Sequence, residues 1–392
     1  MTISKGPQAF PRSEYLRRLA AVKSEMGNRE IDALFVSSPG NVAYLSGFTT
    51  KGYSPASYLI QGLVVTLHEE EPTFILARHH VPAAVYLTFL KPESVIGYPS
   101  LTANPGVDGF DAVIDFLHEA GLANRGVGLE LDSLRAQDQQ KFKARLPKAR
   151  IVDCAKAVDW IRTVKSDLEI AIMREAAAIT DAGIMHAAEV IRPGVREADA
   201  AAEIMATLLR GTNGKSGTGI PLMYVSASPR TFAGHMSFSE DAYRDGSQIN
   251  IELGAVRYGY IATIMRTFSI GKPSDRLRRL HEAQVAGLEA ALNTVRPGAT
   301  CSEVANASHR AIEKHGFKKD TLCGHSEGLN GLEPSAYLVD GDMTVLKPNM
   351  AFHLLLCNFL EEDFSCFVSE TFRVTESGVE VLTRAPRKLF EL

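Results

Sequence analysis

The sequence predicts a mixed α/β (α+β) protein of two domains, and three observations lead to this prediction. The chain has 392 residues, which is more than one ordinary domain holds. Over residues 1–160, short apolar runs alternate with helical stretches, a pattern typical of an α/β domain. Over residues 161–392, two helices followed by two strands are expected twice, which predicts a domain with pseudo-twofold αα-ββ symmetry.

The first half of this repeat begins at a helix start signal. Ser166 and Glu169 have the Ser-x-x-Glu spacing of a capping box. Apolar residues then recur at three- and four-residue steps, and the helix is expected to end near 192–194, which reads Arg-Pro-Gly. A second helix is predicted over Glu197 to Leu209, and a strand-rich segment over Gln248 to Ile270.

The same order returns further along the chain. A capped helix is predicted from Ser274 to the second Arg-Pro-Gly at 296–298, then a helix over Ser302 to His315 and strands over Met350 to Val381. Chance recurrence of Arg-Pro-Gly is the alternative, because short motifs often arise by accident. If the repeat is real, the strands of both halves form a curved sheet with helices outside, and a ligand site lies between the halves.

Composition and charge exclude several classes of protein. The net charge of -4 and the lack of a long basic run argue against a nucleic-acid partner. The first 18 residues mix charged residues with few apolar ones, and no stretch of 18 apolar residues occurs, so we expect a soluble cytoplasmic protein without a membrane partner. Five cysteines without a CxxC pair argue against a disulfide framework and a zinc knuckle.

Several segments resemble motifs of the creatinase, prolidase and methionine aminopeptidase family. They are Pro39 to Phe48, Asn250 to Thr267, Gly324 to Pro334, Leu346 to Met350 and Ser369 to Gly378. The third contains Gly-His-Ser-Glu-Gly where the family has Gly-His-Gly-Ile-Gly. The resemblance covers nearly the whole chain. It implies a creatinase-type N-terminal domain, a C-terminal pita-bread domain and a homodimer.

The metallopeptidases of this family hold two divalent ions with two Asp, one His and two Glu. Carried over to this sequence, the five positions are Glu252, Thr263, His325, Leu355 and Glu370. Threonine is a poor ligand and leucine is none, so the resemblance implies that no two-metal centre forms and that the protein uses no metal cofactor. The further family histidine before Glu-x-Pro is replaced here by Leu332.

A set of acids and histidines remains as the predicted catalytic site. His235 falls where creatinase-like enzymes carry a catalytic histidine, and the resemblance places it with Glu252, Glu370, His325 and Glu333. Each residue alone is more simply a surface acid or a core histidine. Their joint placement favours one acidic site, which a proton or a cationic ligand must compensate. His325 and Glu333 are expected in an outer layer of this site.

Paired carboxylates match a planar amidinium or guanidinium by bidentate hydrogen bonding, so a small cationic or zwitterionic substrate is expected. Two metal-free branches of the family use such substrates: creatinase cleaves creatine, and ectoine hydrolase opens ectoine to N-acetyl-diaminobutyrate. Creatinase keeps carboxylates at the positions of Met265 and Leu355 and a neutral side chain at that of Glu252, and this chain is reversed at all three. The resemblance therefore favours ectoine hydrolase, with a creatinase-type amidinohydrolase as the alternative.

The expected mechanism begins with attack of Glu252 on the amidine carbon, giving a covalent intermediate that water resolves. His235 would be the acid and base, since its unperturbed pKa lies near neutral pH. Glu370, together with Glu333, would hold the ring nitrogens. A direct general-base route, in which Glu252 or His235 activates water, is left open.

The substrate's own carboxylate also needs a partner. Arg230 and Arg266 are the candidates, although Arg266 stands in the family's Arg-Thr position and could serve only to brace the sheet. Thr263 is a further expected substrate contact, and Tyr53 is expected to reach a neighbouring subunit's site or to pack on its own domain.

Other classes of protein stay open at this point. The scaffold also serves as an inactive binding module, and a fold alone does not decide between the two. A lyase of sulfonium compounds is disfavoured, because such relatives keep the metal ligands. Whether a deacetylase acts downstream on the product is not settled by the sequence.

Overall fold

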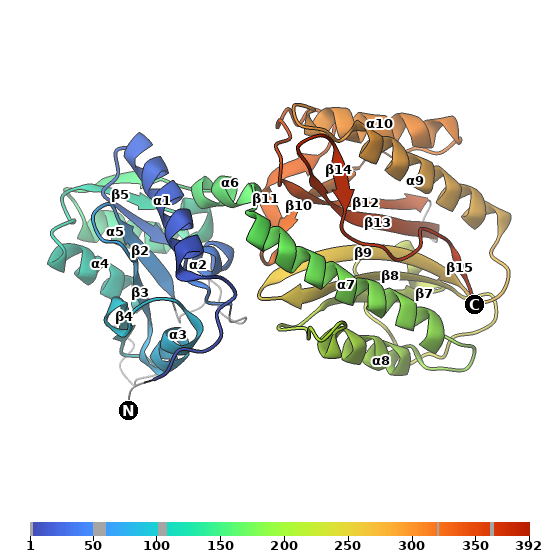
Figure 1. Ribbon diagram of the computed structural model, residues 1–392, viewed down its shortest axis with the longest axis horizontal. Helices are drawn as coiled ribbons and strands as arrows, with labels where there is room; N and C mark the ends of the chain where they lie inside the picture. The colour runs from blue at the N-terminus through green and yellow to red at the C-terminus, as the bar shows by residue number, and fades with distance from the viewer. Residues whose placement is uncertain (1–2, 50–59, 101–107, 320, 361–363) are drawn as a thin grey trace. The chain divides into compact units, whose positions relative to one another are not determined.

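The computed structural model describes residues 3–49, 60–100, 108–319, 321–360 and 364–392 (Figure 1). The chain forms two compact units, 1–162 and 163–392. Across these described ranges, every helix is too short or too polar to cross a membrane.

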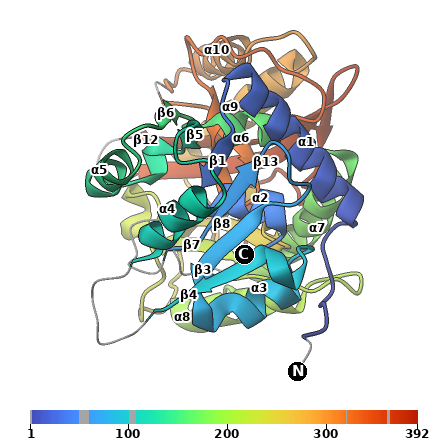
Figure 2. The same ribbon diagram turned by 90° about the vertical axis from the view of Figure 1, so that its left-hand side faces the viewer.

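The first unit is built on one mixed sheet with the strand order β4-β3-β2-β1-β5-β6. Strand β1 is antiparallel to β2 and parallel to β5, the consecutive strands β2 and β3 are antiparallel, and β3 and β4 are parallel with α3 between them. Helices α4 and α5 lie side by side next to this sheet (Figure 2). The strands are β1 (Ala33–Val36), β2 (Gly62–Thr66), β3 (Thr73–Ala77), β4 (Val95–Tyr98), β5 (Gly126–Leu129) and β6 (Arg150–Asp153), and the helices are α1 (Arg12–Asn28), α2 (Pro39–Ser46), α3 (Val81–Leu87), α4 (Gly109–Glu119), α5 (Ala136–Arg145) and α6 (Ala157–Thr163).

The second unit contains the predicted two halves, each with two helices followed by strands, but among the described residues the halves hold three and six strands instead of two. Ser166 caps the first long helix through the predicted capping box with Glu169, and Ser274 caps its counterpart. The first half contains α7 (Asp167–Val190), α8 (Glu197–Arg210), β7 (Leu222–Ala227), β8 (Gln248–Arg257) and β9 (Tyr260–Ser269). The second half contains α9 (Asp275–Thr294), α10 (Cys301–Lys314), β10 (Gly324–Gly328), β11 (Gly331–Leu338), β12 (Ala351–Leu360), β13 (Phe364–Val374), β14 (Val379–Val381) and β15 (Phe390–Glu391).

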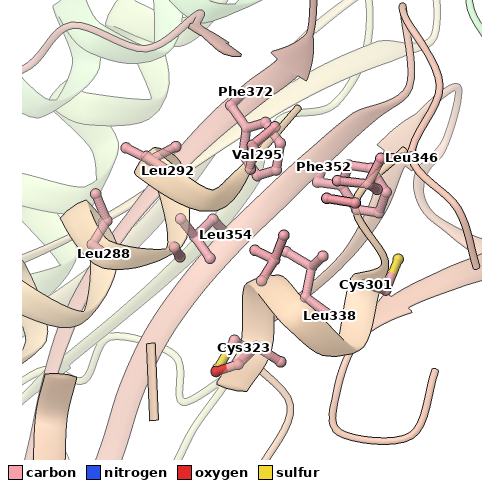
Figure 3. Packing of buried hydrophobic residues seen from close by; sticks show 14 of the residues in the cluster. Leu288, Leu292, Val295, Cys301, Cys323, Leu338, Leu346, Phe352, Leu354 and Phe372 are labelled. Atoms are coloured by element: carbon pink, nitrogen blue, oxygen red, sulfur yellow. The ribbon is translucent and has the colours of Figure 1, made fainter. Parts of the chain in front are cut away.

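The strands of the second unit form two sheets, ordered β11-β10-β12-β13-β14 and β15-β9-β8-β7. One face of each sheet packs against a helix pair, α7 with α8 or α9 with α10 (Figure 1). Figure 3 shows the second of these cores, in which Phe352 and Leu354 of β12 and Phe372 of β13 pack against Leu288 and Leu292 of α9.

Successive side chains of a strand point to opposite faces of the sheet, so only alternate residues point into the helix-covered cores. In β12 and β13 the even-numbered residues enter the helix-covered core, and in β8 the odd-numbered residues do so. The opposite set therefore faces the space where the two sheets meet. Side chains join the sheets there: the amide of Met265 donates to the Ser369 hydroxyl at 2.6 Å, and the amide of Phe367 donates to Thr267 at 2.9 Å.

Candidate active site

The centre of the candidate site is the carboxylate of Glu252 on β8. Its side chain is only 8% exposed, and no hydrogen bond to the carboxylate is found among the described residues. Burial, and secondarily the nearby Glu327 carboxylate, raises the pKa of Glu252 to about 7. A buried carboxylate without a donor is costly to ionise, so Glu252 is suited to a proton or a cationic ligand.

His235 approaches Glu252 from a loop. Its Nε2 atom lies 3.8 Å from Glu252 Oε2, and its side chain is 71% exposed. The residue adopts a left-handed backbone conformation, with φ of 57°, which is uncommon for a residue with a side chain. The predicted pairing of His235 with Glu252 is therefore present, with the imidazole on the open side and the carboxylate on the buried side.

A second buried carboxyl, Glu327 on β10, was not predicted as a site residue. Its Oε1 accepts a hydrogen bond from the hydroxyl of Thr263 at 2.5 Å, and its Oε2 lies 2.7 Å from the hydroxyl of Thr371. Burial raises the pKa of Glu327 to about 7, although the two hydroxyls and Lys165 oppose that shift. The signal for Glu327 was in its motif, because an acid stands here where the family has isoleucine.

Two imidazoles, the half-buried His325 and the buried His353, lie next to each other in this part of the second unit. The rings of His325 and His353 meet edge to face with centroids 5.5 Å apart, and His353 Nε2 lies 2.7 Å from the Ser369 hydroxyl. Burial lowers the pKa of His325 and places that of His353 well below its usual value. Both rings are therefore neutral near pH 7 and add no positive charge. His353 was not predicted from the sequence.

Glu333, a predicted site residue, is neutralised by a buried lysine. Lys165 Nζ lies 2.6 Å from Glu333 Oε2, and both side chains are almost fully buried. The Ser326 hydroxyl also donates to Glu333, at 3.1 Å. Glu333 is thus held by Lys165 and Ser326, and its placement in an outer layer of the site stays a prediction.

The structure places Glu370 apart from Glu252, contrary to expectation. Glu370 is an even-numbered residue of β13, and its carboxylate forms a buried ion pair with Arg266 at 2.8 Å on the helix-covered side. Arg387 at 2.9 Å and the Thr383 hydroxyl complete its shell. Ser369, directly opposite Leu355 in the sheet register, occupies the site-facing position instead.

Both candidate arginines for the substrate carboxylate are already engaged. Arg266 is fully buried and, besides Glu370, donates to the backbone carbonyls of Met265, Ser369, Ala385 and Pro386. Arg230 forms an ion pair with Glu197 at the start of α8 and donates to the carbonyl of Ser237 at 2.8 Å. The expected role as carboxylate receptor does not fit either position. Tyr53 lies outside the described residues.

The residues present do not fit a pair of divalent ions. Of the positions that face the site, Thr263, Leu355 and Ser369 carry no carboxylate, and Thr263 is already hydrogen-bonded to Glu327. Within the part of the chain that the structure describes, no three His, Cys, Asp or Glu side chains are grouped as a metal ion needs. Such ions require several anionic ligands in fixed geometry, and this site offers Glu252 together with Glu327, whose carboxylate is already hydrogen-bonded to Thr263 and Thr371.

The arrangement combines a nucleophile or base with an acid. Glu252 presents a carboxylate with free lone pairs, and His235 can transfer a proton from the open side. Three buried carboxyls, those of Glu252, Glu327 and Glu333, lie in this part of the second unit, and the buried ammonium group of Lys165 pairs with Glu333. The site is therefore suited electrostatically to a small cation.

Two family models match this chain. The model of metallopeptidase family M24 matches residues 171–376, and that of the creatinase/prolidase N-terminal domain matches residues 18–164. A protein of Sinorhizobium fredii described as an uncharacterized hydrolase/peptidase is 60% identical and covers 99% of both chains. The ectoine hydrolase of Halomonas elongata is 30% identical over 97% of this chain and 98% of its own.

Solved structures show the same fold. The X-Pro aminopeptidase from Thermotoga maritima matches with a TM-score of 0.82 at 21% identity, over 95% of this chain and 99% of its own. The Xaa-Pro dipeptidase from Bacillus anthracis matches with a TM-score of 0.78 at 25% identity, over 97% of this chain and all of its own. The predicted fold class, a creatinase-type domain followed by a pita-bread domain, is confirmed.

Proposed function

The chain belongs to metallopeptidase family M24 and carries the creatinase/prolidase N-terminal domain, and from this premise we propose a hydrolase that opens a cyclic amidine. The proposed substrate is ectoine, and the product is N-acetyl-2,4-diaminobutyrate. The main observation behind the proposal is the buried carboxylate of Glu252, whose Oε2 lies 3.8 Å from Nε2 of His235. Other positions at which the peptidases carry metal-binding acids hold different residues in this chain. The 30% identical ectoine hydrolase supports the choice of substrate.

Charge balance supports an amidinium. The pKa of Glu252 near 7 means that its ionised form gains most from a ligand that brings one positive charge. An amidinium is planar, carries two N–H donors and holds its charge on the carbon that a nucleophile must attack. Such a ligand can satisfy the unpaired carboxylate and place the electrophilic carbon next to it.

The proposed reaction proceeds in two steps. A carboxylate oxygen of Glu252 bonds to the amidine carbon, the ring C–N bond breaks, and the leaving nitrogen takes a proton from His235. Water then attacks the same carbon and gives its proton to His235, and the Glu252 carboxylate leaves. The sum is the addition of one water, which yields an amide on one nitrogen and a free amine on the other.

The test is incubation of purified full-length enzyme with ectoine, with creatine and with an Xaa-Pro dipeptide in parallel. Formation of N-acetyl-diaminobutyrate alone supports the proposal. Formation of urea and sarcosine from creatine would favour the creatinase-type alternative. Cleavage of the dipeptide would show that the protein is a peptidase, and no turnover of any substrate would favour an inactive binding module.

Variants then test the roles of the two residues. Glu252→Gln should abolish turnover while the protein stays folded, and the exposed Glu376→Gln is the matched control. In a single turnover of the unmodified enzyme that is stopped with acid, mass spectrometry should detect Glu252 modified by substrate. Turnover without a detectable adduct under single-turnover conditions would favour the direct general-base route.

A further inference from the structure

The loop that carries His235 is fixed to its surroundings at several points. The amide of Val225 on β7 donates to the carbonyl of Met236 at 3.1 Å. The Glu197 carboxylate binds Arg230 and accepts from the amide of Ser239 at 2.9 Å. The backbone on both sides of His235 is thus held, and the imidazole itself remains 71% exposed.

An exposed imidazole needs a neighbour to keep one orientation, because its side-chain torsions are otherwise free. Tyr224 supplies that neighbour. Its ring lies 4.7 Å from the His235 ring, centroid to centroid, at an interplanar angle of 55°. Tyr224 is also the residue directly opposite Glu252 in the antiparallel pairing of β7 with β8. Directly paired residues project to the same face of a sheet, so one strand pair carries both the carboxylate and the ring that supports its partner.

We propose that Tyr224 is a positioning residue, whose ring holds the His235 imidazole within reach of the Glu252 carboxylate. The inference rests on the proposed function of that site. The aromatic ring of Tyr224 positions His235, and the hydroxyl group of Tyr224 has no part in this role. Phenylalanine should therefore replace Tyr224 without loss, and leucine, which is apolar but not aromatic, should not.

The first measurement does not depend on activity. In spectra of the full chain labelled with carbon-13 at histidine, the His235 signal is assigned by its loss in His235→Gln. A ring current from Tyr224 should displace that signal in the unmodified protein and in Tyr224→Phe, and the displacement should vanish in Tyr224→Leu. An unchanged signal in all three proteins would overturn the inference, whatever the substrate proves to be.

The second measurement is a double-mutant cycle on turnover. Tyr224→Leu should lower kcat by roughly tenfold or more with little change in KM, because a misplaced acid and base slows chemistry more than binding. In the His235→Gln background the same change should cost less than about twofold, since residues that act together are not additive. Equal losses in both backgrounds would overturn the inference. If ectoine and related amidines are not hydrolysed, the proposed function fails, and the spectra still decide the role of Tyr224.

Discussion

The hydroxyl of Thr371 lies 2.7 Å from a carboxylate oxygen of Glu327 and connects β13 to β10. The same hydroxyl lies 2.8 Å from the carbonyl of Thr263 and accepts from the Thr263 amide at 2.9 Å. One hydroxyl proton therefore has two acceptors. Thr371 donates to Glu327 when that carboxyl is ionised, and it can accept from Glu327 and turn to the carbonyl when the carboxyl is protonated.

Replacing Thr371 by valine should show how much its hydrogen bond to Glu327 contributes to the free energy of unfolding. The change keeps the shape of the side chain and leaves Glu327 with one hydroxyl partner fewer in a buried position, so the free energy of unfolding should fall by about 1–3 kcal/mol. Urea denaturation measures the difference. Thr371→Ser keeps the hydroxyl and should lose less, and equal loss in both variants would count against the hydrogen bond.

Stability should depend on pH through Glu252 and Glu327. Burial raises the pKa of both carboxyls to about 7 in the folded chain, against an ordinary value of 4.5 for a glutamate side chain. Between these values the folded chain holds protons that the unfolded chain has lost, so the free energy of unfolding falls as pH rises from about 4.5 to about 7 and then levels. Each carboxyl contributes up to about 3 kcal/mol to this fall. Urea midpoints across this range should fall less steeply with pH in Glu327→Gln than in the unmodified protein, and equally steeply in Glu376→Gln; a flat profile in the unmodified protein would refute the assignment.

Glu370→Gln should reduce stability rather than chemistry. The variant leaves the buried Arg266 guanidinium without its charged partner, which typically costs about 3–5 kcal/mol. The protein that remains folded at low temperature should keep kcat within about twofold, because the carboxylate lies on the helix-covered side of β13. Thermal unfolding and active-site titration separate the two effects. A stable protein with no activity would instead restore Glu370 to the catalytic site.

Arg230→Gln and Glu197→Gln should have matching effects. Each removes one side of the ion pair that holds the His235 loop to α8, so kcat should fall by a similar factor, roughly tenfold, with KM nearly constant. Steady-state kinetics on both variants makes the comparison. An increase in KM confined to Arg230→Gln would show that this arginine receives the substrate carboxylate after all.

Removal of metal should leave the enzyme active. The side chains at Thr263, Leu355 and Ser369 cannot complete a ligand set, so chelator treatment followed by dialysis should not change kcat, and added manganese should not raise it. Elemental analysis of the purified protein accompanies the assay. Activity lost to the chelator and restored by a divalent ion would contradict the donor-set argument.

Much of the fold could be predicted from the sequence because its signals are local. The capping box at Ser166 and the hydroxyl cap at Ser274 mark the starts of the paired long helices, and both are formed in the structure. Glycine-rich and polar β10 gave no strand signal, since its sequence Gly324–Gly328 lacks the alternation of a half-buried strand. Its conformation depends on pairing with β11 and β12.

The site was less predictable because it depends on which way each strand residue faces. Ser369 and Glu370 are neighbours in sequence, yet one reaches Met265 at the meeting of the sheets and the other reaches Arg266 on the reverse side. A shift of one residue in the motif comparison is enough to exchange them. His353 has no sequence signal of its own, since its burial beside His325 results from packing between distant strands.

Alternate residues of strands β9 and β13 point to opposite faces of the sheet, and the two faces have different roles. Arg266 and Glu370 form a buried ion pair on the side covered by helices, and Thr263, Ser369 and Thr371 line the side of the proposed active site. A lineage can therefore exchange one set of alternate residues and acquire a new reaction while the other set goes on keeping the chain folded. A scaffold built in this way could carry the proposed ring-opening site on the same strands without a change of fold.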